Sequence, residues 1–371
     1  MDLAVELAKK GHTVSIVTIN RDLQYRLESL LSIFYMKRKV SLDAKFKFSE
    51  SDLKKYLENV SLYEVSSLKE MRERLKQSDI IYSKNEIVDL FVLRLLNLGR
   101  SPPIICGVHT AIFYPHTENI QSKIHNFLYL GIFYGKLLQE CSAFHVLNSE
   151  DVNVLHNNFP SVRAPIKQIP HYVDVDNYAL NDSNEDFNIL FVGRLDTEQK
   201  GVDVLVRIVE YLSSREDFDC LKFTVVGSGE LSPIMEKLAG KYSNFSYKGY
   251  VEQETLQDLY ASSDLCIVPS RWETFSYVCL ESQSHGLPVI ASDIPGPRDI
   301  IIENETGFLV NPDRPAEFGN RVLFLYQMKK TNPVKYADMR KKIQKCAIER
   351  FSKKRILCRL EDMFKNSTTQ K

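Results

Sequence analysis

The sequence predicts two α/β domains, each with a parallel sheet covered by helices on both faces, that face one another across a cleft. The second half of the chain alternates short apolar runs with segments of helical periodicity, as βα units do. The first half has the same alternation, less regularly. The length of 371 residues leaves room for two domains of about 150 residues each. Ligands of such sheets bind outside the carboxyl ends of the strands, which predicts a ligand site in the cleft.

The first domain is expected to span 1–176. It begins with a helix at 2–10, which Gly11 ends. Apolar runs then predict strands, and a long segment at 120–140 predicts a helix. The strands are expected at 13–19, 60–65, 79–83, 103–108 and 143–148. The polar stretch at 177–186 has no apolar period and marks the expected boundary.

The second domain is expected to span 177–350. Its first two apolar runs end in glycine, which is typical of a buried parallel strand that enters a turn. Strands are expected at 187–193, 221–227, 245–249, 264–270, 288–292 and 307–310, and helices at 201–214 and 230–240. Two further helical stretches, at 333–350 and 352–365, end the chain.

Composition and charge exclude several classes of protein. Lys and Arg together number 48, as do Asp and Glu, so the chain has no net charge to hold a nucleic acid by bulk electrostatics. No apolar run reaches the roughly 18 residues of a membrane helix, and the first residues lack the apolar core of a secretory signal, so we expect a cytoplasmic protein. The seven cysteines include no Cys-x-x-Cys pair, which favours buried thiols over a zinc or redox site.

Three segments at strand ends carry the candidate chemistry. In the first, at 191–203, Gly193 allows a tight turn after a strand. Arg194 and Lys200 then bring two cations to the start of the next helix. Helix N-termini favour anions, so this segment is a candidate diphosphate site. Two solvated cations beside a glycine turn are the alternative.

The second segment, at 269–292, holds two carboxylates with seven residues between them, Glu273 and Glu281. A helix that starts near Ser276 would place Glu273 in the preceding loop and Glu281 within the first turns. Eight positions span at most about 12 Å, the scale of a sugar diphosphate. Backbone N–H groups around Phe275 and Tyr277 could hold phosphate. An amphipathic helix with two surface glutamates is the alternative.

The third segment, VVGSGE at 225–230, predicts a tight turn between a strand and a helix. Gly227 is a candidate nucleotide contact in this turn. A dinucleotide-binding loop is the competing interpretation, but the three-glycine fingerprint is absent. We expect Tyr250 and its neighbours at 249–251 to contact the nucleotide base, uridine or guanosine.

These segments resemble the donor domain of the family 4 glycosyltransferases, which have the GT-B fold of two facing Rossmann-like domains. The matching stretches are GRLDTEQKGVD, VVGSGE, YKGYVEQETLQDLYASSDLCIVPS and ETFSYVCLESQSHGLPVIAS. The resemblance implies transfer of a sugar from a nucleotide donor with retention at the anomeric carbon. Arg194 and Lys200 match the pair that neutralises the leaving diphosphate. Glu273 matches the residue that contacts the donor sugar, and Glu281 the one that holds the ribose hydroxyls.

The sequence also departs from the family pattern. Family members often have glycine where this chain has Thr274 and Ser276. In the first half, GVHT ends a strand with His109, where the family often has a histidine that faces the donor phosphates and sugar. His116 is its rival on the same loop. The segment 351–371 begins like the family's last helix, which implies that it packs back on the first domain.

The resemblance also implies the ligands. The donor is expected to be a UDP- or GDP-sugar, with no further cofactor, and the acceptor a growing glycan or a lipid-linked saccharide. Asp174 and Asp176 have a metal-binding spacing, but they lie in the hinge match, and GT-B enzymes generally need no metal for chemistry. The basic, partly apolar run at 36–47 is either a solvated face or a contact with an anionic membrane, at its cytoplasmic side.

Two other functions compete with sugar transfer. One is a nucleotide-sugar isomerase or a phosphorylase on the same scaffold, and the other is a non-catalytic homologue that only binds. The second is motivated by the N-terminus, because family chains begin with a strand and a Gly-rich loop before the helix seen here at 2–10. We therefore predict that this first strand and loop are missing and that Met1 is an internal start, with the natural frame continuing upstream.

Overall fold

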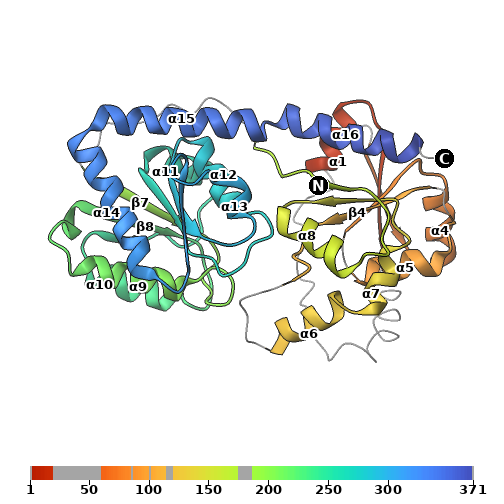
Figure 1. Ribbon diagram of the computed structural model, residues 1–371, viewed down its shortest axis with the longest axis horizontal. Coiled ribbons are helices and arrows are strands. Elements are labelled where there is room, and N and C mark those ends of the chain that lie inside the picture. The colour runs from red at the N-terminus through yellow and green to blue at the C-terminus, as the bar shows by residue number, and fades with distance from the viewer. Residues whose placement is uncertain are drawn as a thin grey trace.

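The computed structural model describes residues 2–19, 60–84, 87–99, 102–113, 120–173 and 186–369. It shows two α/β domains side by side, each with parallel sheet, and two consecutive long helices that run along one side of both (Figure 1). The predicted fold class is thereby confirmed. Met1, the run at 36–47, His116, Asp174 and Asp176 lie outside the described residues, so the interpretations placed on them stay predictions.

The N-terminal domain has two parallel sheets within its described residues. One pairs β1 with β2, and the other has the order β3-β4-β5-β6. The strands are β1 (Val14–Ile19), β2 (Val60–Val65), β3 (Ile81–Lys84), β4 (Ile104–Val108), β5 (Ala143–Val146) and β6 (Ile166–Gln168). The helices are α1 (Asp2–Lys9), α4 (Leu68–Lys76), α5 (Ile87–Leu96), α6 (Ile120–Tyr129), α7 (Ile132–Leu138) and α8 (Ser149–Asn158).

The helix predicted at 120–140 is two helices, α6 and α7. Gly131 has extended backbone angles and is the N-cap of α7, so the helical path is interrupted there. The sequence signal was the glycine in Leu130-Gly131, which the strong apolar period on both sides obscured.

The C-terminal domain has one six-stranded parallel sheet with the order β12-β11-β10-β7-β8-β9. Its strands are β7 (Phe187–Val192), β8 (Leu221–Val226), β9 (Phe245–Tyr247), β10 (Leu265–Val268), β11 (Val289–Ser292) and β12 (Gly307–Val310). Its helices are α9 (Val202–Ser213), α10 (Ser232–Lys241), α11 (Gln253–Ser262), α12 (Tyr277–Ser284), α13 (Pro297–Ile300) and α14 (Pro315–Thr331). The helix α14 was not anticipated from the sequence.

The order of the strands places the ligand crevice of this sheet. From β7 the chain proceeds outward to β8 and β9, and it then returns to β10 on the other side of β7 and proceeds to β11 and β12. The direction of winding therefore reverses between β7 and β10. In open α/β sheets, ligands bind outside the carboxyl ends of the strands at such a switch point. The loops that follow β7 and β10 are the ones that contain Arg194, Lys200 and Glu273.

The core of this domain has a layer on each face of the sheet. Alternate residues of β7 point to opposite faces, as a strand requires, so Ile189 packs in one layer and Leu190 in the other. The first layer includes the apolar stripe of α9 and residues of α14 such as Phe318, and the second includes residues of α11 and α12. Both faces are buried, which explains why the strands read as continuous apolar runs rather than as alternating ones.

Helices α15 (Pro333–Phe351) and α16 (Lys353–Thr369) run from the C-terminal domain to the N-terminal domain (Figure 1). Three buried residues of α16 pack with residues of β4, β5 and the segment after β6: Ile356, Leu357 and Leu360, against Ile105, Ala143 and Ile169. Polar contacts also join the domains. The Asn148 amide donates to the carbonyl of Thr274 (2.8 Å), and Asp299 accepts from the Gln168 amide (2.7 Å) and from the backbone of Ser149 (3.1 Å).

Candidate active site

The loop after β7 is organised by a carboxylate. Asp196 accepts hydrogen bonds from the backbone N–H groups of Gln199 and Lys200, both at 2.8 Å, and from Nε of Arg194 at 2.6 Å. Burial alone raises the pKa of Asp196, but these hydrogen bonds together lower it below its usual value. The charged Asp196 therefore closes the loop and sets the direction in which Lys200 leaves the backbone.

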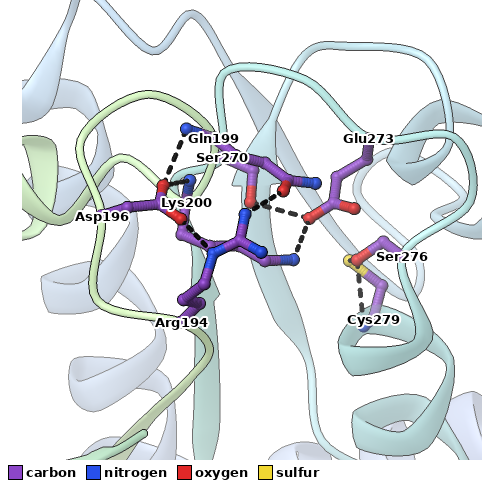
Figure 2. Close-up of polar contacts among 8 residues, drawn as sticks. All are labelled: Arg194, Asp196, Gln199, Lys200, Ser270, Glu273, Ser276 and Cys279. Atoms are coloured by element: carbon purple, nitrogen blue, oxygen red, sulfur yellow. Dashed lines mark hydrogen bonds and ion pairs between the residues drawn. The ribbon is translucent and has the colours of Figure 1, made fainter. Parts of the chain in front are cut away.

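The loop after β10 supplies the partner of Lys200. The Lys200 ammonium donates to Oε1 of Glu273 at 2.6 Å, and the Ser270 hydroxyl donates to the same oxygen at 3.0 Å (Figure 2). The Lys200 side chain is 20% exposed and that of Glu273 is 8% exposed. A backbone hydrogen bond from Arg271 to Gln199 (2.8 Å) joins the two loops directly. The structure therefore brings together a cation and a carboxylate that are far apart in the sequence.

Arg194 lies beside this pair rather than in it. Its side chain is 63% exposed, and its guanidinium group binds Asp196 and Oε1 of Gln199 (2.7 Å) within its own loop (Figure 2). An exposed arginine held in place at one edge can still reach an anion that arrives from solvent, because it has five N–H donors and these partners use few of them. Asp196, Gln199 and Ser270 were not identified from the sequence, although Asp196 is followed by a turn, a known role of aspartate.

Two glycines allow the loop after β7 to approach the turn after β8 and the loop after β10 closely. A Cβ atom on Gly227, whose φ is +133°, would lie 1.8 Å from the carbonyl oxygen of Gly193. A Cβ atom on Gly201, whose φ is +63°, would lie 2.1 Å from the carbonyl oxygen of Pro269. No other residue fits either place. Gly193 and Gly227 are therefore held against one another, and whether either contacts a nucleotide stays a prediction.

The N-terminus of α12 follows the Glu273 loop directly. Ser276 is its N-cap and has a φ of +81°, an uncommon conformation for a residue other than glycine. The Ser276 hydroxyl accepts a hydrogen bond from the backbone of Cys279, which compensates in part for the backbone strain. The substitution of serine for the family's glycine thus keeps the glycine-like backbone. Phe275 is buried and Tyr277 is half-exposed.

Glu281 lies on α12, apart from the Lys200–Glu273 pair. Its Oε2 atom accepts a hydrogen bond from the Tyr260 hydroxyl at 3.0 Å. Burial raises the pKa of Glu281, while the hydrogen bond from Tyr260 acts in the opposite direction. Tyr260 is fully buried on α11 and fixes the orientation of this carboxylate. Tyr260 was not identified from the sequence, because its place in the apolar period of α11 indicates only a residue of the core.

Tyr250 follows β9 and is 72% exposed. The neighbouring Gly249 has a φ of +64°, and its carbonyl accepts from the backbone of Gly227 at 2.8 Å. The segment at 249–251 therefore lies next to the glycine turn after β8, and contact with a nucleotide base stays a prediction.

His109 reaches the domain boundary from the N-terminal side. It follows β4, and its ring stacks on His171 with centroids 5.4 Å apart. The His171 ring stacks in turn on Tyr277 (4.6 Å) and meets Phe275 edge to face (5.2 Å). This column of rings connects His109 to the N-terminus of α12. The ring of His171 thus lies between His109 and the N-terminus of α12, and a role of His109 at the donor stays a prediction.

A shallow hollow that is open to solvent adjoins Glu273 between the two domains. Phe113, Glu150 and Asp151 line it from the N-terminal domain, and Trp272 lines it from the C-terminal domain. Burial raises the pKa of Asp151 to about 6, against hydrogen bonds from the backbone of Ile112 and the side chain of Asn148. The wall of the hollow thus offers aromatic rings and carboxylates beside the Lys200–Glu273 pair.

Within the residues that the structure describes, no group of three or more His, Cys, Asp or Glu side chains is arranged to hold a metal ion. Across the same residues, no helix is both long and apolar enough to cross a bilayer.

Comparison with known families covers almost the whole chain. Residues 1–177 match the family described as Glycosyltransferase Family 4, and residues 186–328 match the family described as Glycosyl transferases group 1. The chain belongs to the family 4 glycosyltransferases. This is a family of retaining transferases. The resemblance inferred from the motifs is confirmed, and both domains of this family 4 chain contribute to it.

The curated relatives match part of the chain. An uncharacterized 41.2 kDa protein in the cps region of Klebsiella pneumoniae is 35% identical over 127 residues, which are 34% of this chain and 33% of that protein. The chain spans about a third of the length of the curated relatives it matches.

Solved structures match at the level of the fold. Sucrose-phosphate synthase from Thermosynechococcus elongatus has a TM-score of 0.69 and 18% identity, and the match covers 98% of this chain and 91% of that one. The Anabaena protein HepE, solved in complex with UDP-glucose, has a TM-score of 0.64 and 17% identity over 85% of this chain and 88% of that one.

Proposed function

We propose that this family 4 protein transfers a sugar from a nucleoside diphosphate donor to a hydroxyl group of a saccharide, with retention of the anomeric configuration. One observation carries the proposal. The ion pair of Lys200 and Glu273, with 2.6 Å between Nζ and Oε1, lies at the switch point of the sheet and beside the N-terminus of α12. Such a point combines a fixed cation with the N-terminal end of a helix, whose dipole favours an anion, and this combination suits a diphosphate.

The residues of this site have separable roles in the proposed reaction. Lys200 and Arg194 bind the diphosphate and stabilise the negative charge that grows as it leaves. Glu273 accepts hydrogen bonds from hydroxyl groups of the donor sugar, and Glu281 from those of the ribose. Glu273 is not a covalent nucleophile in this proposal, because transfer on a single face of the sugar needs no covalent intermediate with the protein.

The chemical step is a substitution on one face of the sugar. The bond between the anomeric carbon and the phosphate oxygen breaks, and a bond from the same carbon to the acceptor oxygen forms on that face. The acceptor hydroxyl gives its proton to the departing phosphate oxygen, so no enzyme base is required. The two cations keep that oxygen's negative charge in place without reorganisation.

We propose a uridine or guanosine diphosphate sugar as the donor and a growing glycan or lipid-linked saccharide as the acceptor. The complex of HepE with UDP-glucose supports UDP as the first nucleotide to test. The Klebsiella relative in a cps region supports a role in polysaccharide synthesis. The hollow beside Glu273 supports a saccharide acceptor, since its rings and carboxylates suit the apolar faces and hydroxyl groups of sugars.

The test is release of nucleoside diphosphate from a panel of UDP- and GDP-sugars, with and without mixed oligosaccharide acceptors. We expect release that depends on an acceptor. Conversion of the donor to a new nucleotide sugar without acceptor would instead indicate an isomerase, and release that depends on inorganic phosphate a phosphorylase. Calorimetric binding of UDP or GDP with no turnover would indicate a non-catalytic homologue. Each of these three outcomes contradicts sugar transfer.

We also propose that the N-terminal domain rests on an anionic membrane at the cytoplasmic face. Exposed apolar side chains on α6 and α7 support this contact: Ile120, Ile124, Phe127, Ile132 and Phe133. Phe127 is 79% exposed and Ile132 84% exposed. The two helices carry lysines and no acidic residue. Exposed apolar side chains flanked by lysine are typical of surfaces that insert into the headgroup region of anionic bilayers.

Sedimentation with vesicles of phosphatidylglycerol and phosphatidylcholine tests this contact. Replacing both Phe127 and Ile132 by Ser is expected to reduce the bound fraction at least tenfold, because each buried side chain contributes about 1.5–3 kcal/mol. Val334→Ser is the matched control, since Val334 is 71% exposed on α15 of the other domain. Equal binding by the double variant and the control would contradict the proposed surface.

A further inference from the structure

A chain of hydrogen bonds connects His109 through Tyr82 and His145 to the backbone of Ile169. The Tyr82 hydroxyl, on β3, is 2.8 Å from Nε2 of His109 and 2.5 Å from Nδ1 of His145, on β5. The Nε2 atom of His145 is 2.7 Å from the carbonyl oxygen of Ile169. Strand β4 lies between β3 and β5, and the Tyr82 side chain crosses it at Gly107. Only glycine leaves room there, because a Cβ atom on Gly107 would lie 2.3 Å from the Tyr82 oxygen.

The direction of each hydrogen bond follows from the contact between His145 and the carbonyl oxygen of Ile169. A carbonyl oxygen only accepts, so Nε2 of His145 carries the proton. Burial lowers the pKa of His145 to about 4, so near neutral pH this ring has one N–H group and its Nδ1 atom is an acceptor. The Tyr82 hydroxyl, whose pKa burial raises, must therefore donate to Nδ1 of His145.

The same reasoning reaches His109. A hydroxyl group has a single proton, and that of Tyr82 is committed to His145. Toward His109 the Tyr82 oxygen can only accept, so the Nε2 atom of His109 is the donor. His171, which stacks on His109, is itself neutral near pH 7, because burial lowers its pKa to about 3.

We propose that Tyr82 and His145 are positioning residues that hold His109 in the tautomer protonated at Nε2, with this N–H group donating to the Tyr82 oxygen. In this state the His109 ring keeps one orientation beside His171 at the domain boundary, and its action on substrate depends on that orientation. The part that concerns substrate rests on the proposed sugar transfer, whereas the tautomer does not.

The tautomer can be measured without any substrate. The full chain, labelled with [¹⁵N]histidine, has eight histidines, and long-range ¹H–¹⁵N spectra near pH 7.5 distinguish protonated from unprotonated ring nitrogens. The signals of His109 are assigned by their absence in His109→Gln. We expect a protonated Nε2. A His109 ring protonated at Nδ1 alone, or averaged between the two tautomers, would overturn the proposal even if every variant below failed to fold.

Variants of the two positioning residues supply the second readout. Tyr82→Phe and His145→Phe remove the fixed acceptor, so the His109 signals should move toward the average of the two tautomers. His145→Gln is the conservative rescue, because its amide can accept from Tyr82 and donate to Ile169, and it should keep the wild-type pattern. Unchanged His109 signals in a folded Tyr82→Phe protein would overturn the role of Tyr82.

Kinetics separate this proposal from the proposed function. With the nucleotide sugar found active in the donor panel, we expect kcat/KM to fall about tenfold in Tyr82→Phe and in His145→Phe, and to recover in His145→Gln. A protein without transferase activity would refute the proposed function and leave the tautomer result standing. A tautomer shift in Tyr82→Phe with unchanged kcat/KM would overturn the positioning role alone.

Discussion

Replacing Lys200 by Ala is expected to reduce kcat for sugar transfer about 10³-fold. Removal of one preorganised donor from a site where charge develops typically costs 10²–10³ in rate, and Lys200 is such a donor to the leaving diphosphate. The substitution also leaves the carboxylate of Glu273 with Ser270 as its remaining side-chain partner among the contacts described above. Departure of the diphosphate and orientation of the donor-sugar hydroxyl groups should therefore both be impaired. Steady-state kinetics with the active nucleotide sugar measure the effect.

The matched control for Lys200→Ala is Lys222→Ala. Lys222 lies on β8 of the same domain, and its Nζ atom is 3.9 Å from Asp186 in an exposed pair. Exposed ion pairs contribute about 0–1 kcal/mol, so this variant should keep wild-type kcat. Thermal unfolding of both variants checks that the fold is intact. A Lys200→Ala protein with kcat within threefold of the control would remove Lys200 from the proposed mechanism.

Replacing Gly227 by Ala is expected to destabilise the C-terminal domain by more than about 3 kcal/mol, a size reserved for strain or for serious packing damage. The added Cβ would lie 1.8 Å from the carbonyl oxygen of Gly193, and the φ of +133° disfavours any side chain. The neighbouring atom is backbone, so relief requires the turns after β7 and β8 to separate. Because Arg194 and Lys200 follow the first of these turns, donor binding should weaken as well.

Gly240→Ala provides the matched control for Gly227→Ala. Gly240 lies within α10 of the same domain, and a Cβ atom there meets nothing within 4 Å. Alanine is the better helix former by about 1 kcal/mol, so this variant should be as stable as the wild type or slightly more stable. Urea unfolding followed by circular dichroism measures both. Equal free energies of unfolding for the two variants would show that the turns do not pack as described.

The sequence predicted the C-terminal domain well because its strands are buried on both faces. Runs such as that of β7 contain too many apolar residues for a one-sided strand, and each ends in a turn that the motifs mark. The pairing of Lys200 with Glu273 was predictable in outline, since both follow strands of one sheet. That these are β7 and β10, adjacent at the switch point, required the strand order.

The groups that orient the site were not predictable in the same way. Ser270 and Asp196 bind residues that are only three or four positions away in the sequence. Many serines and aspartates in turns make such short-range contacts without any role in a site. Tyr260, Tyr82 and His145 bind residues on other strands or helices. The sequence alone does not show that these partners lie within hydrogen-bond distance. The Ser276 conformation was equally hidden, because serine does not signal a positive φ as glycine would.

The anomeric configuration of the first product tests the proposed same-face transfer most directly. The reaction contains an α-configured nucleotide sugar that supports acceptor-dependent turnover, and ¹H NMR reads the coupling constant of the new anomeric proton before any equilibration. We expect an α-linked product formed in equal amount with the released nucleoside diphosphate. A β-linked product would contradict the same-face mechanism and the roles proposed for Lys200, Arg194 and Glu273 in it.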